Sequence, residues 1–113
     1  MKSLVFTSIL MALFASCNDF QNINKESPKI NEIISGNGFC IVLPENHTTG
    51  YLWQLSNTYN AKCADYLNAV WHGNEKGIYF NFMAAEKGKT ELNFALIKHQ
   101  DTSEVKTFII EVK

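Results

Sequence analysis

The chain has 113 residues, 46% of them hydrophobic, which is enough for one domain with a buried core and excludes a disordered chain. The 10 basic and 11 acidic residues leave a formal net charge of −1. This balance excludes the strongly basic surface of proteins that bind nucleic acid or an anionic membrane surface.

Residues 1–17 predict an export signal. Lys2 is followed by an apolar run, residues 4–14, that is too short to remain as a membrane-spanning helix. The run ends in Leu13-Phe14-Ala15-Ser16-Cys17, which resembles the signal of bacterial lipoproteins. The resemblance implies that Cys17 becomes the lipid-bearing N-terminus and that the mature chain is exported and anchored in the bacterial cell envelope. An ordinary secretory signal cleaved nearby is the alternative.

Residues 18–28 are polar and hold little to bury, so we interpret them as a flexible tether between the lipid and a domain at residues 29–113. With Cys17 assigned to the lipid, Cys40 and Cys63 remain in that domain. A disulfide can persist in an exported protein, and the sequence leaves open whether these two cysteines pair.

The domain is dominated by short segments in which apolar and polar residues alternate. The clearest is residues 78–84, where Ile78, Phe80, Phe82 and Ala84 share one face. Similar segments occur near residues 29–34, 39–43, 51–55, 66–72, 92–96 and 105–112. About seven short strands separated by turn residues predict an all-β, immunoglobulin-like sandwich.

The order of these strands also predicts where their connections lie. If successive strands run antiparallel, the connections at residues 44–50, 72–77 and 98–104 gather at one end of the sandwich. Three polar loops at one end form a composite binding edge. Cys40 and Cys63 fall toward the opposite end, where a disulfide would not interfere with the loops.

A histidine lies in or beside each of these loops, at His47, His72 and His99, so a small metal-dependent enzyme is one alternative. Each loop supplies only one histidine, however, and we interpret the nearby acids, which are Glu45, Glu75 and Asp101, as ordinary surface residues. Thr48 and Thr49 have no evident activating partner for nucleophilic catalysis. The sequence therefore predicts no metal, no cofactor and no enzymatic activity.

The two tryptophans have different expected roles. Trp53 alternates with Tyr51 and Leu55 and is expected in the core of the sandwich. Trp71 lies at the rim of the second loop, where it is either buried or an exposed anchor for a partner. The sequence does not decide between these two roles.

The first loop has a residue pattern that suits an ordered tip. Asn46 can cap the loop through its side chain, Gly50 permits close approach of the backbone, and Thr48 and Thr49 are stiff β-branched residues. A loop ordered in advance loses little entropy when it docks into a cleft. A plain connection between two strands is the alternative for the same residues.

The stretch Asn46-His47-Thr48-Thr49-Gly50-Tyr51-Leu52-Trp53 resembles the Asn-Pro-Thr-Thr-Gly-Tyr/Phe-x-Trp signature of the chagasin-like inhibitors of papain-family cysteine peptidases. The resemblance covers residues 39–113. It implies an immunoglobulin-like sandwich whose first loop enters the catalytic cleft above the nucleophilic cysteine and is not cleaved. In this chain Thr48, Thr49 and Gly50 would fill the cleft, and Asn46 and Tyr51 would shape the loop.

The flanking loops depart from that family's pattern. The second loop is glycine-rich in the family, whereas here Gly73 and Gly77 bracket Asn74, Glu75 and Lys76. The third loop has Lys98, His99 and Gln100 where the family has Arg-Pro-Trp. His47 replaces the proline of the first loop, which removes a fixed φ.

The expected function is reversible inhibition of a papain-family cysteine peptidase by a monomer that a lipid holds at the membrane. The alternative is an envelope lipoprotein of the same fold that uses its loop end to bind another protein or a glycan. The missing third-loop tryptophan favours this alternative.

Overall fold

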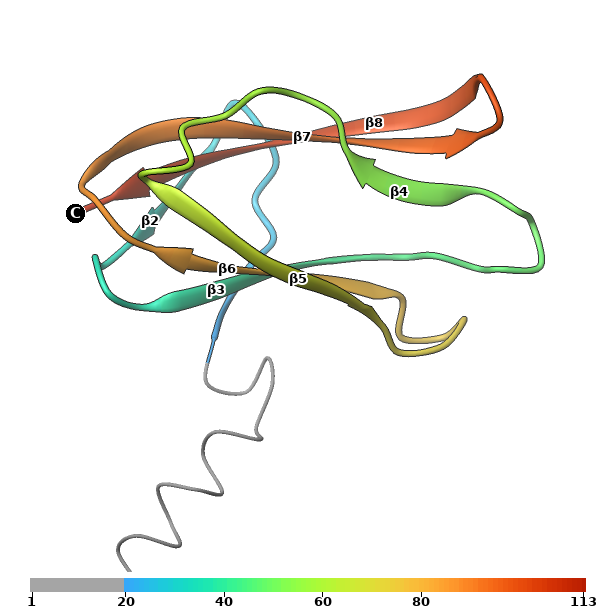
Figure 1. Cartoon of the computed structure of the whole chain (residues 1–113), viewed down its shortest axis with the longest axis horizontal. Coiled ribbons are helices and arrows are strands. Elements are labelled where there is room, and N and C mark those ends of the chain that lie inside the picture. Colours follow the sequence, from blue (N-terminus) through green and yellow to red (C-terminus); the bar gives the residue numbers. More distant parts are fainter. Residues whose placement is uncertain (1–19) are drawn as a thin grey trace, which may run out of the picture.

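The computed structural model describes residues 20–113, which form two facing four-stranded sheets (Figure 1). The strands are β1 (Gln21–Ile23), β2 (Ile30–Ile33), β3 (Gly38–Leu43), β4 (Leu52–Leu55), β5 (Ala64–Trp71), β6 (Ile78–Ala84), β7 (Gly88–Lys98) and β8 (Asp101–Val112). One sheet has the order β1-β3-β6-β5 and the other β2-β8-β7-β4. The predicted sandwich is confirmed. Within residues 20–113 no helix is long and apolar enough to cross a membrane.

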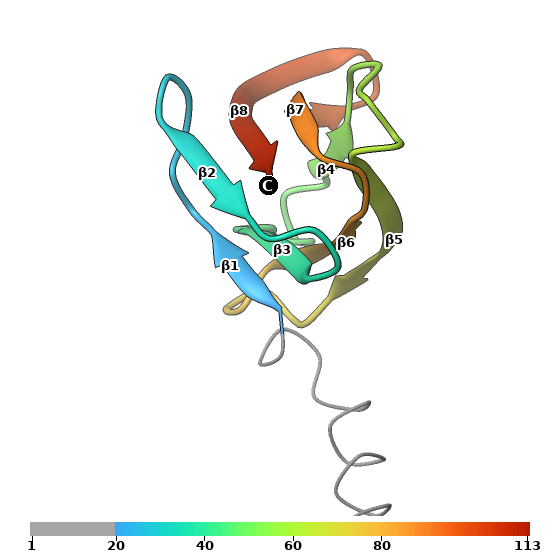
Figure 2. The ribbon, with the colours of Figure 1, turned by 90° about the vertical axis from the view of Figure 1, so that its left-hand side faces the viewer.

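The core lies between the two sheets, which enclose it on both sides (Figure 2). In the first sheet the apolar residues of β3 lie opposite those of β6, with Phe39 paired to Phe82 and the two rings stacked at 5.0 Å. Phe80 of the same sheet contacts Phe94 of the other sheet, with ring centroids 4.7 Å apart. Strand alternation places these residues on the inner faces, and their burial is what holds the two sheets together.

The hairpin of β7 and β8 is longer than expected. The apolar pattern predicted a last strand from residue 105, but β8 begins at Asp101 and its pairing with β7 continues up to Lys98. Residues 101–104 are polar and exposed, so their pairing comes from backbone hydrogen bonds and leaves no apolar period in the sequence. The third loop is therefore a tight turn at His99 and Gln100.

Part of the expected tether is a strand. β1 pairs in parallel with β3, and its Ile23 is only 2% exposed within the core. The assignment of all of residues 18–28 to a flexible tether is therefore wrong for Gln21–Ile23. A single apolar residue among polar ones carries no period, and its burial depends on the free edge of β3, which the local sequence does not reveal.

The two cysteines of the domain lie on opposite faces of the first sheet. Cys63 is a buried free thiol in the core between the sheets. Cys40 alternates with Phe39 and Ile41, which point into that core, so its side chain points away from it. The structure thus contains no Cys40–Cys63 disulfide, and the pairing that the sequence left open does not occur. Cys17 and the export signal lie outside the described residues.

Three connections gather at the same end of the sandwich, as the strand order predicted (Figure 1). They are the first loop between β3 and β4 (residues 44–51), the second loop between β5 and β6 (residues 72–77), and the third loop at the β7–β8 turn (residues 98–101). Hydrogen bonds from the first loop to both of the others join them into one surface.

Candidate functional site

Asn46 organises the tip of the first loop. Its side-chain Oδ1 accepts a hydrogen bond from the Thr48 backbone N–H at 3.0 Å and from the Thr48 hydroxyl at 2.7 Å. Its carbonyl oxygen accepts from the Thr49 N–H at 3.1 Å and from the Thr49 hydroxyl at 2.8 Å. The chain then turns at Gly50, whose φ is +82°, a conformation that favours glycine. The expected capping role of Asn46 is confirmed.

The tip itself is presented to solvent. Thr48, Thr49 and Gly50 are all exposed, and the hydrogen bonds of both threonine side chains stay within the loop. With both hydroxyls engaged in holding the turn, neither has a base beside it that could activate it as a nucleophile. The tip is thus a small, ordered protrusion with little chemical reactivity.

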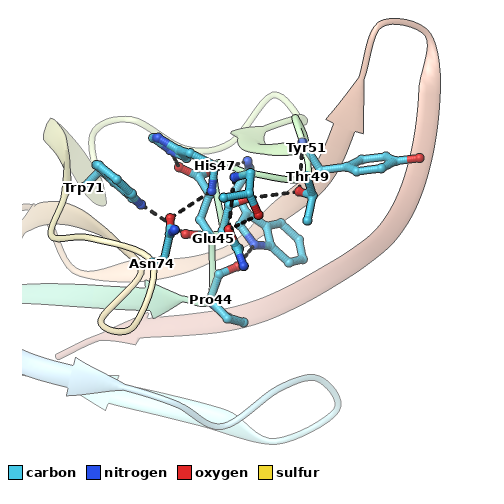
Figure 3. A network of polar contacts seen from close by, with 10 residues as sticks. Pro44, Glu45, His47, Thr49, Tyr51, Trp71 and Asn74 are labelled. Carbon is cyan, nitrogen blue, oxygen red and sulfur yellow. Dashed lines mark hydrogen bonds and ion pairs between the residues drawn. The ribbon is translucent and has the colours of Figure 1, made fainter.

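Glu45 lies at the start of the first loop and is not the surface residue that its charge predicted. It is only 3% exposed. Its Oε1 accepts the backbone N–H of Trp53 at 2.7 Å, and its Oε2 lies 2.7 Å from Nε2 of His47 (Figure 3). The sequence did hold a signal for this burial, because Glu45 continues the alternation of Phe39, Ile41 and Leu43 on the core face of β3.

His47 is held from three directions. Its ring stacks on the ring of Trp71, with centroids 3.7 Å apart and an angle of 9° between the planes. Its ring nitrogen contacts Glu45, and its backbone N–H donates to Oδ1 of Asn74 in the second loop at 3.0 Å (Figure 3). The first and second loops are thereby joined.

Trp71 is neither fully buried nor fully exposed, so its position lies between the two alternatives that the sequence left open. The side chain is half-buried, with 40% of the residue exposed, and its indole Nε1–H donates to the Glu45 carbonyl oxygen at 3.0 Å. One face of its ring stacks on the ring of His47. Trp53, by contrast, is 4% exposed in the core, as expected, and its Nε1–H donates to the Pro44 carbonyl oxygen at 2.7 Å.

The second loop is closed by its two glycines. The Gly77 N–H donates to the Gly73 carbonyl oxygen at 2.8 Å, and both residues have positive φ, +85° and +101°. Gly77 also packs against the end of β3, where a Cβ would lie 3.0 Å from the Leu43 carbonyl carbon and 3.2 Å from the Pro44 Cα. This close approach places Asn74 within reach of His47. Glu75 and Lys76 are exposed at the tip.

The third loop contacts the other side of the first loop. The hydroxyl of Tyr51 donates to Oδ2 of Asp101 at 2.5 Å, and this hydrogen bond, with smaller contributions from burial and the carboxylate charge, raises the pKa of Tyr51 above its usual value. The Lys98 ammonium lies 5.7 Å from the Tyr51 ring centroid, and its stem lies against Gly50. His99 adopts a φ of +57° in the turn.

The loop histidines do not come together. His47 contacts Glu45 and Trp71, His72 packs on Tyr79 with ring centroids 4.2 Å apart, and His99 lies in the third-loop turn. Across residues 20–113 no three residues of the His, Cys, Asp and Glu types are grouped so that they could hold a metal ion. The geometry favours a binding surface.

Comparisons with known proteins agree with this geometry. The family model described as chagasin family peptidase inhibitor I42 matches residues 32–112. No curated protein sequence matches the chain. Among the solved structures that are similar in fold is a cysteine protease inhibitor, EhICP2, from Entamoeba histolytica, with a TM-score of 0.67, 13% identity and coverage of 83% of this chain and 93% of that one. Another is amebosin, with a TM-score of 0.56, 14% identity and coverage of 83% of this chain and 98% of that one. Because the family model spans most of the chain, this protein belongs to the chagasin family of peptidase inhibitors.

Proposed function

We propose that this protein is a reversible inhibitor of papain-type cysteine peptidases and that residues 46–51 occlude the active-site cleft. The observation that carries the proposal is the exposed tip of Thr48, Thr49 and Gly50, held in shape by bonds within its own loop. Family membership supports peptidase inhibition. One similar structure is that of a cysteine protease inhibitor, which supports the choice of peptidase class.

The turn explains how such a tip blocks a cleft without being cut. A peptidase needs its substrate extended across the catalytic residues, whereas the Thr49 N–H bond to the Asn46 carbonyl keeps the backbone folded. Small side chains let the tip enter a narrow cleft. Because the loop is already ordered, docking loses little conformational entropy.

The flanking loops widen the contact on both sides of the tip. The stacked rings of His47 and Trp71 lie on the side of the second loop, and Tyr51 with Lys98 lies on the side of the third loop. The third-loop turn itself has no tryptophan, tyrosine or phenylalanine. We propose that the ring of Tyr51, held by Asp101, supplies the aromatic surface there.

An inhibition assay tests the proposal directly. The purified chain is assayed against a panel of papain-type peptidases, with a serine peptidase as the specificity control. We expect Thr48→Glu combined with Thr49→Glu to abolish inhibition, because two acids at the tip cannot enter the cleft. The matched control is Thr58→Glu with Ala61→Glu, which adds the same charge at exposed positions outside the three loops and should inhibit normally. Absence of inhibition at micromolar concentration across the panel, or inhibition that survives the tip change, would refute the mechanism.

The position of the protein in the cell is part of the same proposal. The sequence of residues 4–17 supports export and attachment of lipid at Cys17, which would place a monomeric inhibitor at the bacterial cell envelope. Metabolic labelling with a radioactive fatty acid should mark the wild-type chain and leave Cys17→Ser unlabelled. Labelling of the serine variant, or recovery of the wild type in the cytoplasm, would contradict the anchor.

A binding module of the same fold is the second candidate, favoured by the absence of a tryptophan from the third-loop turn. Affinity capture with the wild-type chain and with the Thr48→Glu, Thr49→Glu variant separates the two. A papain-type peptidase lost from the variant supports inhibition. A different protein or a glycan lost in the same way supports the module.

A further inference from the structure

We infer that Glu45 and Trp71 are positioning residues of the inhibitory loop, which act by clamping His47 so that the tip is presented in one orientation. The inference rests on the proposed function for its effect on inhibition. Its structural part, the order of the loop in the free protein, can be measured without any peptidase.

The tip needs such a clamp because its own hydrogen bonds are local. Asn46 holds Thr48 and Thr49 in a turn, but those bonds fix the shape of the turn and not its direction relative to the sandwich. The direction is set where the turn meets the scaffold. On one side this is Tyr51 with Asp101, and on the other it is His47.

Glu45 links His47 to the scaffold. One carboxylate oxygen accepts the N–H of Trp53, a residue of β4, and the other contacts the His47 ring. The Glu45 side chain is almost fully buried, with a relative exposure of 2%, and a buried carboxylate requires its hydrogen-bond partners. Release of His47 would leave one carboxylate oxygen without this partner, so the loop and the scaffold are coupled through Glu45.

Trp71 closes the clamp from β5. Its ring covers one face of His47 and its indole N–H holds the Glu45 carbonyl oxygen, so one side chain restrains both the ring and the backbone at the start of the loop. With Asn74 on the His47 N–H, three side chains, those of Glu45, Trp71 and Asn74, fix this residue.

The clamp takes the place of a covalent restraint. His47 occupies the second position of the turn that Asn46 begins, and a proline there would fix φ by its own ring, in a dipeptide that favours turn initiation. If Trp71 acts by restraining His47, a proline at position 47 makes Trp71 dispensable. If Trp71 acts by touching the peptidase, a proline at position 47 does not reduce the loss of inhibition that Trp71→Leu causes.

The test is a double-mutant cycle on the purified full chain. Trp71→Leu should raise the inhibition constant about 10-fold, the effect of one newly mobile side chain or loop segment. His47→Pro gains a fixed φ but loses the N–H bonded to Asn74 and the ring beside Glu45, so it sets its own reference level of inhibition. The double variant should stay within about 3-fold of His47→Pro, because Trp71 then has no His47 ring to restrain. Tyr66→Leu is the matched control, because Tyr66 lies on the same strand with 41% exposure and does not contact the loop; it should inhibit normally.

The order of the loop supplies the independent measurement. Backbone order parameters of Thr48 and Gly50 should be about 0.85 in the wild type and in the double variant, and should fall below about 0.6 in Trp71→Leu. Glu45→Ala should lower them in the same way. Glu45→Gln keeps an acceptor oxygen for the Trp53 N–H and offers an amide N–H to an unprotonated Nε2 of His47, so it should leave them near the wild-type value.

The outcomes separate the two ideas. A double variant about 10-fold weaker than His47→Pro, or an unchanged order parameter in Trp71→Leu, would overturn the positioning role. A wild-type chain that inhibits no peptidase but shows the expected loss of order in Trp71→Leu would refute the proposed function and leave the clamp standing.

Discussion

Gly77 offers a sharp test of how the second loop is built. Its φ of +85° and its contact with the end of β3 both oppose any larger residue. Gly73, in the same loop, has a φ of +101°, but a methyl group added to it would meet no atom within 4 Å. The two glycines therefore separate backbone strain from steric exclusion.

The expected magnitudes follow from that difference. An alanine at positive φ costs about 1–2 kcal/mol, and this is the whole effect expected for Gly73→Ala. In Gly77→Ala the new methyl group also meets the Leu43 carbonyl and the Pro44 Cα, which adds about 1–3 kcal/mol for overpacking against backbone atoms that cannot rotate away. We expect Gly77→Ala to lower the free energy of unfolding by about 2–5 kcal/mol in total.

Urea denaturation at equilibrium measures both changes. The slope of the free energy against urea concentration should be the same for the wild type and both variants, so that a shift in midpoint reports stability. Gly77→Ala should also weaken inhibition more than Gly73→Ala, because displacement of the second loop carries Asn74 away from His47. Equal destabilisation by the two substitutions would refute the role assigned to the contact with β3.

Two further predictions concern titratable groups. Tyr51 should ionise above the usual tyrosine range, and Asp101→Asn should lower the pKa of Tyr51. The stabilisation from this pair is present below about pH 10 and is lost as the pH rises through the raised pKa. Absorbance titration, with Tyr51→Phe as the reference, follows the ionisation. Burial is the main cause that raises the pKa of the Cys63 thiol, so a thiol reagent should label it slowly in the native protein and quickly in denaturant. Failure to label Cys63 in denaturant without a reductant would contradict its free state.

The fold was accessible from the sequence wherever burial alternates along a strand. Phe80 and Phe82 identify the core face of β6, because successive residues of a strand point to opposite sides and these two therefore share one side. The common end of the three loops followed from the same strands, since it needs only their order and direction. β1 escaped prediction because one buried residue, Ile23, has no period to detect.

The site was accessible only in part. The turn at Asn46 could be predicted because its bonds reach two or three residues along the chain. Glu45 was misjudged because residue type outweighed its place in the alternation of β3, although that alternation pointed inward. A carboxylate is expected to be exposed unless a hydrogen-bond donor is known that can satisfy it when it is buried. The donor here is the Trp53 N–H, which is eight residues away across a loop.

By itself the sequence determined the strands other than β1, their inner faces, the loop end and the turn that shapes the tip, because these depend on patterns over a few neighbouring residues and on the order of the strands. The tertiary structure alone decided the partners of His47, the hydrogen-bond donor that Glu45 meets and the separation of Cys40 from Cys63. The stack of His47 on Trp71 joins residues 24 positions apart, and the bond from Asn74 spans 27. Such contacts exist only once β3 and β5 lie in one sheet and bring their loops together.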